Sequence, residues 1–207
     1  MRTTLLAFFF LAFAFALSTA LAAIDVEPVN GVPVLDTDGN PVFNGGLYVI
    51  LPATPENGGG FNMFALDGET CPISVAQSPS NNSLGMSLFI RVDAPEPVRY
   101  VYTNNSVNII FAAIPVCANS SKWIVKIFTP VPAVFIGEED ERTVAGHFQI
   151  RNYEDAYKLV FCPDFVPGTC WDLGISPFGN RRLVTNEQNP FKLVIRSLNP
   201  KTSASII

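Results

Sequence analysis

Residues 34–50 read VLDTDGNPVFNGGLYVI, and this stretch decides how the chain folds. Residues 38–41 (DGNP) predict a turn, because glycine adopts positive φ at little cost, Asp and Asn side chains bond nearby backbone, and proline fixes the exit. Gly45 and Gly46 predict a second turn. The run that follows, 47–51, is rich in β-branched and aromatic residues and stops at Pro52. Short apolar runs between turns predict the start of an all-β domain.

The same alternation of short apolar runs and turns continues to the C-terminus, with 17 Pro and 14 Gly in the chain. The predicted strands are 47–51, 61–66, 73–77, 86–92, 98–102, 107–111, 123–128, 134–136, 147–151, 157–161, 173–176, 182–185 and 191–196. About a dozen short strands are typical of a barrel or a sandwich, and closure into a barrel leaves no unpaired edge. An aromatic residue two places ahead of an aliphatic one recurs at Tyr48, Trp123 and Tyr157, which favours three repeats.

The N-terminal segment 1–22 has the layout of a secretory signal. One cation, Arg2, precedes an apolar run from Leu5 to Leu17, and small residues follow. The run is too short to span a bilayer as a stable helix. We therefore expect a signal peptide at 1–22, one domain at 23–198, and a C-terminal tail at 199–207.

The charge balance and the motifs exclude several function classes. Without Arg2, 12 basic residues face 18 acidic ones, a net charge of −6, and no Lys/Arg run is present. Such a surface is a poor fit for nucleic acid or an anionic membrane. His147 is the single histidine, no Cys-x-x-Cys occurs, and no nucleophile-elbow, phosphate-loop or zinc-protease motif appears. We expect no metal, no cofactor and no enzymatic activity.

The opening stretch resembles the signature of the plant Kunitz-type (legume trypsin inhibitor) family. The matching positions are Val34, Asp36, Gly39, Val42, Tyr48 and Ile50. Further blocks resemble the family in the same order, at 71–78, 121–125, 133–138, 157–162, 172–175 and 181–184. The resemblance implies a β-trefoil, which we prefer to a sandwich.

Four cysteines remain after removal of the signal: Cys71, Cys117, Cys162 and Cys170. An even number in a secreted chain predicts disulfides, and composition alone allows three pairings. The segment between Cys162 and Cys170, PDFVPGT, is so rich in turn residues that its ends can meet. We therefore expect Cys162–Cys170 and Cys71–Cys117, and the family resemblance implies the same pattern.

The resemblance also implies that function lies on one exposed loop between the fourth and fifth strands, shaped like a peptidase substrate. The corresponding segment, residues 91–100, reads RVDAPEPVRY. Counting back from Phe111 places Glu96 or Pro97 at the primary specificity position, where trypsin inhibitors carry a basic residue. The loop residues predicted to bind a peptidase are Arg91, Asp93, Pro95, Glu96, Pro97, Val98 and Arg99. Arg91 and Arg99 also have an ordinary interpretation, as solvated residues at a strand end and on an outward strand face.

The sequence thus predicts a secreted, monomeric Kunitz-type peptidase inhibitor. Its expected target is a serine peptidase, not necessarily trypsin, with a cysteine peptidase or a carboxypeptidase as alternatives. A non-inhibitory defence, storage or signalling protein is the competing interpretation. The sequons at Asn81, Asn104 and Asn119 predict glycosylation on the secretory route, with an extracellular destination preferred to a vacuolar one.

Overall fold

The computed structural model describes residues 31–94, 97–128, 130–186 and 188–198. The predicted signal peptide and tail, and Pro95 and Glu96 of the predicted loop, lie outside these residues. The described strands are β1 (Leu47–Pro52), β2 (Phe61–Phe64), β3 (Ser74–Gln77), β4 (Leu88–Val92), β5 (Ser106–Phe111), β6 (Trp123–Lys126), β7 (Ala133–Ile136), β8 (Thr143–Val144), β9 (Gly146–Tyr153), β10 (Ala156–Pro163), β11 (Trp171–Ile175), β12 (Leu183–Thr185) and β13 (Leu193–Ser197), with one 3-10 turn, η1 (Pro55–Asn57).

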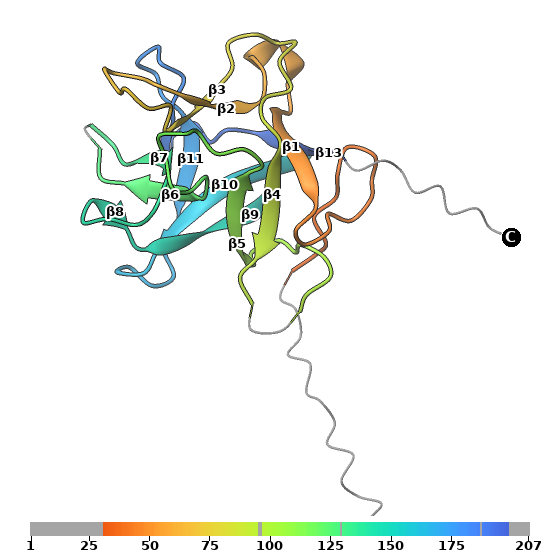
Figure 1. Ribbon diagram of the computed structural model, residues 1–207. Helices are drawn as coiled ribbons and strands as arrows, with labels where there is room; N and C mark the ends of the chain where they lie inside the picture. The colour runs from red at the N-terminus through yellow and green to blue at the C-terminus, as the bar shows by residue number, and fades with distance from the viewer. Residues whose placement is uncertain (1–30, 95–96, 129, 187, 199–207) are drawn as a thin grey trace, which may run out of the picture.

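Six of the strands close into a barrel (Figure 1). The path β13-β1-β4-β5-β9-β10 returns to its start because β10 also pairs with β13, through Tyr157 and Leu193. The hairpin pairs β2–β3, β6–β7 and β11–β12 stand outside this ring, and β7 joins the other two hairpins through β3 and β12. Three units of barrel strand, hairpin and barrel strand make the β-trefoil predicted from the sequence.

Alternation of buried and half-buried residues along the strands fills the core of the barrel. β5 alternates between half-buried and buried residues along its whole length, so one face of the strand enters the core. Trp123 lies in the middle of that core, with Phe61, Phe111 and Phe148 around it at ring-centroid distances of 5.3–6.4 Å. Edge-on and tilted rings at this spacing add attraction to the area that they bury.

Two sequence expectations about strands are corrected. Residues 98–102 form two isolated bridges, Phe43↔Tyr100 and Pro33↔Tyr102, in place of a regular strand. The aromatic–aliphatic pattern at Tyr48, Trp123 and Tyr157 does not mark equivalent positions of the three repeats. Trp123 belongs to the hairpin strand β6, whereas Tyr48 and Tyr157 lie on barrel strands. The two-residue strand β8, which pairs with β6, was not predicted.

The structure joins Cys71 to Cys117 and Cys162 to Cys170, the two disulfides that were predicted.

Arg182, whose side chain is 1% exposed, also connects distant segments. Its guanidinium lies 3.0 Å from Asp67 and 2.9 Å from Glu69, and 4.4 Å from the ring centroid of Phe128. A buried cation with two carboxylate partners fixes the β2–β3 connection against β12.

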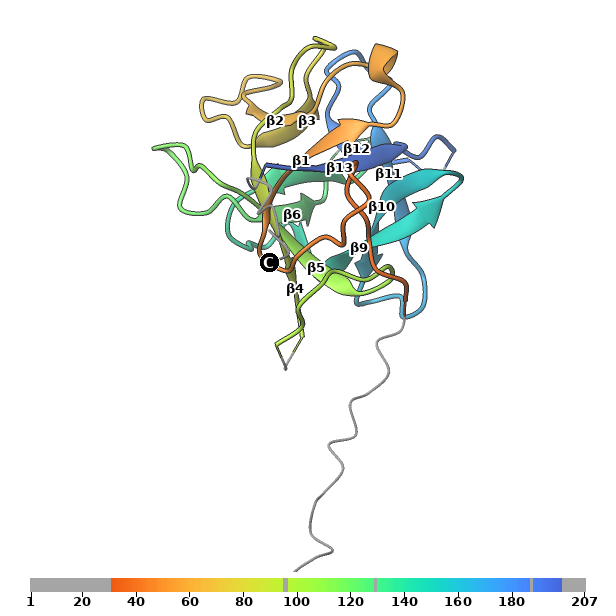
Figure 2. The same ribbon diagram turned by 90° about the vertical axis from the view of Figure 1, so that its right-hand side faces the viewer.

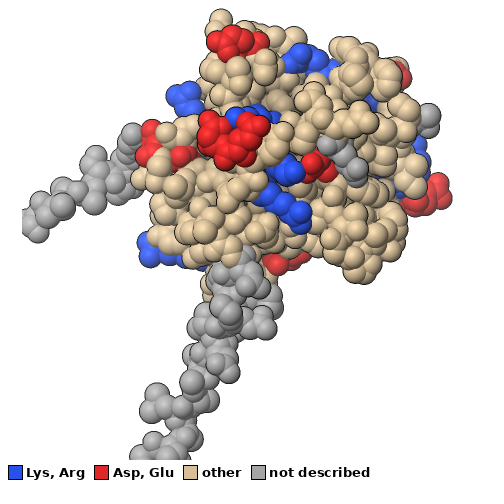
Figure 3. Space-filling view, turned by 180° about the vertical axis from the view of Figure 1, so that it is seen from behind, with Lys and Arg blue, Asp and Glu red and all other residues tan. Residues whose placement is uncertain are grey.

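The surface carries charges of both signs. On the face seen in Figure 3, Lys and Arg are interspersed with Asp and Glu among uncharged residues. All four residues of the acidic run 138–141 are exposed. Asp140 accepts a 2.6 Å hydrogen bond from Lys126, and this bond lowers the pKa of the Asp140 carboxyl. Within the described residues, no helix is long and apolar enough to cross a membrane, and no three His, Cys, Asp or Glu side chains gather as metal ligands.

Candidate peptidase-binding loop

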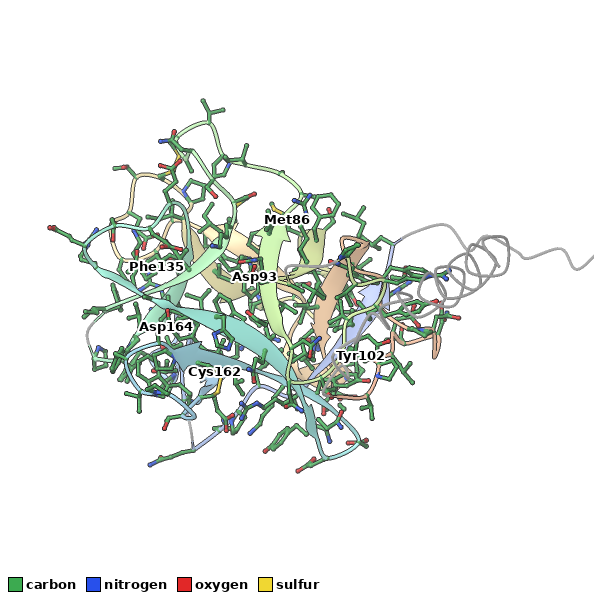
Figure 4. The ribbon with its side chains drawn as sticks, turned by 90° about the horizontal axis from the view of Figure 1, so that it is seen from below. Met86, Asp93, Tyr102, Phe135, Cys162 and Asp164 are labelled. Carbon is green, nitrogen blue, oxygen red and sulfur yellow. A yellow bond between two sulfur atoms is a disulfide. The ribbon has the colours of Figure 1, made fainter. Side chains whose placement is uncertain are left out.

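The connection between β4 and β5, residues 93–105, projects from the lower end of the barrel in Figure 1. Asp93 and Tyr102, near its two ends, are labelled in Figure 4, which views that end directly. Asp93, Ala94, Pro97 and Arg99 are exposed, and Val98 is half-buried. Asp93, Pro97, Val98 and Arg99 of the predicted site therefore lie on one accessible loop, whereas Arg91 lies on β4.

The returning half of the loop lies along the N-terminal segment that opened the sequence analysis. Val101 N–H donates to Val42 O at 2.8 Å, and Val34 N–H donates to Val101 O at 2.9 Å. Val101 is fully buried between these partners. The segment 34–44 thus supports the loop as well as starting the fold.

Asn44 is the residue that fixes the width of the loop. Its side-chain Nδ2 donates to Val98 O at 2.8 Å, and its Oδ1 accepts from Val92 N–H at 2.9 Å. Its backbone N–H also donates to Arg99 O at 3.0 Å. One amide side chain therefore ties the residue where β4 ends to the residue where the loop returns.

The position of Asn44 depends on Tyr48 and Gly46. The Tyr48 hydroxyl accepts a 2.7 Å hydrogen bond from Phe43 N–H, and burial raises the pKa of this phenol. A Cβ on Gly46 would lie 2.7 Å from the Tyr48 ring and hydroxyl, so only glycine leaves room for this contact. The glycine pair and the tyrosine of the opening stretch therefore hold the turn that carries Asn44.

The two arginines of the loop region are accounted for locally. The Arg99 guanidinium lies 5.2 Å from the Tyr100 ring centroid and 5.7 Å from that of Phe43, and those two rings are 5.0 Å apart. Arg91 is an exposed residue within β4, 5.7 Å from the Phe89 ring centroid. Both make cation–π contacts of the kind that surface arginines often make.

Asn44 was not among the residues that the sequence analysis assigned to the loop. Little in the sequence indicated its role, because a single Asn before two glycines is typical of an ordinary turn.

His147, the single histidine, lies 4.0 Å from Asp164 and beside Gln149 on β9, and is part of no catalytic arrangement among the described residues. The three sequon residues Asn81, Asn104 and Asn119 are all exposed.

A closed β-barrel that holds an exposed loop between fixed ends is a scaffold that can present this loop to a partner protein. The family described as trypsin and protease inhibitor, of the Kunitz legume type, matches residues 34–196. The chain belongs to this family. Its members are named for inhibiting peptidases, so this is a family of inhibitors and not of enzymes.

Individual relatives agree with this assignment. The chain is 34% identical over 181 residues to the Kunitz-type trypsin inhibitor KTI2 of Glycine max, covering 82% of this chain and 87% of the relative. It is 36% identical over 170 residues to the trypsin inhibitor BvTI of Bauhinia variegata, covering 80% and 96%.

Among solved structures, soybean trypsin inhibitor in complex with porcine pancreatic trypsin is similar with a TM-score of 0.72 at 31% identity, covering 81% of this chain and all of that one. Winged bean albumin 1 is similar with a TM-score of 0.67 at 28% identity, covering 80% and 98%.

Proposed function

We propose that this protein inhibits a serine peptidase other than trypsin by presenting residues 91–99 as a substrate-like loop. The observation that carries the proposal is the Asn44 bridge, which holds Val92 and Val98 at a fixed separation across the exposed residues. The trypsin complex of the soybean relative supports the serine class of target.

Preorganisation is the physical basis of inhibition by such a loop. A loop that is already ordered loses little conformational entropy on binding, so more of the contact free energy appears as affinity. If the peptidase cuts a bond in the loop, Asn44 and the barrel keep the new ends close together, which favours resealing over release. The inhibitor is then bound without being consumed.

The composition of the loop indicates the target. The S1 pocket of trypsin ends in a carboxylate. Glu96 would be repelled by that carboxylate, Pro97 cannot reach it, and the Arg99 guanidinium is engaged by two rings. A chymotrypsin-like or subtilisin-like peptidase, whose S1 pocket is not acidic, fits this loop better.

The test is an inhibition panel with the oxidised protein lacking residues 1–22. The panel contains trypsin, chymotrypsin, subtilisin, a papain-like cysteine peptidase and a serine carboxypeptidase. The loop variants are Arg91→Ala, Glu96→Ala, Pro97→Ala and Arg99→Ala, and Arg196→Ala, exposed on β13, is the matched control.

We expect tight inhibition of at least one serine peptidase of the panel other than trypsin, and inhibition of trypsin alone would contradict the proposed target. Substitution of Glu96 or Pro97 should weaken the expected inhibition by about 30-fold or more, the effect of losing a contact worth at least about 2 kcal/mol. Arg91→Ala, Arg99→Ala and the control should change it less than about tenfold, since cation–π contacts at exposed sites contribute about 0.5–1 kcal/mol. No inhibition of any peptidase with both disulfides intact would favour the non-inhibitory storage, defence or signalling role.

We further propose that the protein is secreted, loses residues 1–22 and is glycosylated. Two disulfides fit an oxidising compartment, and the exposed sequon residues are accessible to a glycosyltransferase. Mass spectrometry of the protein secreted by a plant host tests the cleavage site and the occupancy of each sequon. An intact Met1–Ala22 segment on the secreted protein would contradict the proposal.

A further inference from the structure

A cavity of about 560 Å³ opens near η1. Figure 1 shows η1 at the upper end of the barrel, whereas the β4–β5 loop lies at the lower end, and Figure 2 shows the same arrangement from the side. The lining comes from segments near residues 52–58, 77–81, 153–154, 175–181 and 189–192. Its volume is within the range of about 300–1,000 Å³ that is typical of small-molecule sites.

The floor of the cavity is polar and fixed. Gln77, which is 1% exposed, donates from Nε2 to Asn57 O at 2.9 Å. Arg181 donates to the same carbonyl at 2.6 Å and also to the Gln77 side-chain oxygen. The Arg181 Nε is buried and has no protein partner, and the residue adopts a left-handed φ of 52°, which is unusual for arginine.

Gly58 lets this floor form. Its φ is +101°, and a Cβ at this position would lie 2.5 Å from the Arg181 guanidinium and 2.8 Å from Ser78 O. Any larger residue would therefore displace the arginine from the floor. Buried polar groups and a strained backbone both cost free energy, so their concentration at one cavity is typical of a ligand site.

The charges around the cavity select a neutral ligand. Lys192 donates to Glu154 at 2.6 Å and is also paired with Asp155. Glu56 and Glu154 both line the cavity, so the formal charges of the lining cations Arg181 and Lys192 are matched by two carboxylates. An anionic ligand would have to compete with these carboxylates for the two cations.

The neutral lining has the chemistry that recognises a saccharide. Thr54 and Asn189, both exposed, offer a hydroxyl and an amide for hydrogen bonds to sugar hydroxyls and acetamido groups. The half-buried rings of Tyr153 and Phe191 offer apolar surface for the C–H face of a sugar ring.

We propose that this cavity is a saccharide-binding site. Two sources of sugar are compatible with its position. Asn81, the first residue of a sequon, is exposed and lines the cavity, so the base of its own glycan could enter. A free saccharide is the second source. The inference does not depend on peptidase inhibition, because the two sites lie at opposite ends of the barrel.

The test uses N,N′-diacetylchitobiose, the disaccharide at the base of N-linked glycans, and non-glycosylated protein from a bacterial host with both disulfides formed. Binding is followed by NMR through the backbone amides of Gly58, Gln77 and Lys192. The blocking variant is Thr54→Trp, since Thr54 has an extended backbone and makes no capping hydrogen bond. The matched control is Thr70→Trp, at an exposed residue outside the cavity.

We expect a saturable shift with a Kd on the order of 1 mM. Thr54→Trp should weaken it at least about tenfold, and Thr70→Trp should leave it unchanged. No shift up to about 10 mM sugar, where a site of this affinity would be mostly filled, overturns the proposal. An undiminished shift in Thr54→Trp overturns it as well, because the sugar would then bind elsewhere.

A second arm distinguishes the two sources, using glycosylated protein from a plant host. If the Asn81 glycan fills the cavity, added disaccharide causes no shift, and a peptide amidase releases this glycan more slowly from folded wild type than from folded Thr54→Trp. If the disaccharide binds glycosylated and non-glycosylated protein equally, or if Asn81 carries no glycan, the ligand is a free saccharide.

Discussion

Replacement of Asn44 by alanine isolates the contribution of loop preorganisation. The change removes the side-chain hydrogen bonds to Val92 and Val98, at 2.9 and 2.8 Å, and leaves the backbone bond to Arg99 in place. Each lost hydrogen bond contributes about 0.5–1.5 kcal/mol net, so ordering the loop becomes less favourable by about 1–3 kcal/mol. That loss corresponds to inhibition weaker by about 5- to 150-fold.

The assay compares the inhibition constant of wild type, Asn44→Ala and Asn44→Asp against the peptidase found in the panel. Aspartate keeps an acceptor for Val92 N–H but cannot donate to Val98 O, so we expect weakening here too. Asn40→Ala is the control, because Asn40 is an exposed turn residue whose side chain bonds only Asp36 among the described residues. An inhibition constant for Asn44→Ala within twofold of wild type would refute the argument from preorganisation. Faster cleavage of the Asn44→Ala loop by catalytic peptidase is the second expected result.

Three further outcomes follow from the scaffold. Arg182→Met should lower the free energy of unfolding by about 1.5–3 kcal/mol in urea, because half-buried Glu69 loses its charged hydrogen-bond partner while Asp67 is exposed to solvent; exposed Arg196→Met, the control, should change it little. Burial raises the pKa of the Tyr48 phenol. The contribution of the neutral phenol to stability is therefore complete below the unfolded-state pKa of about 10 and is lost as pH rises through the folded-state pKa. Tyr48→Phe should flatten the decline of the melting temperature at alkaline pH. By loop-closure entropy, alanine replacement of the Cys71–Cys117 pair, 46 residues apart, should cost about 4 kcal/mol, against about 2.5 kcal/mol for Cys162–Cys170, 8 apart, and equal losses would contradict that account.

Most of the strands were predictable because their formation depends on residues that are close together in the sequence. Twelve of the thirteen predicted strands overlap strands of the structure, since short apolar runs between Gly and Pro leave few other conformations. The exception, 98–102, has the composition of a strand, but its partner segment turns at 36–40 and so pairs with it at two positions only. The pattern at Trp123 did not identify a barrel strand, because an aromatic-x-aliphatic triplet fits a hairpin strand as well as a barrel strand.

The sequence by itself determined the all-β class and the cysteine pairing, since turn residues and strand periodicity act over a few neighbours, and the family resemblance implied the loop between the fourth and fifth strands. Only the tertiary structure decided that Asn44 bridges the loop, that Arg182 is buried between carboxylates, and that Gly58, Gln77 and Arg181 form one cavity floor. These contacts join residues 54, 113 and 104 positions apart. Hydrogen bonds and ion pairs act over a few ångströms, and closure of the barrel is what brings such distant residues within that range.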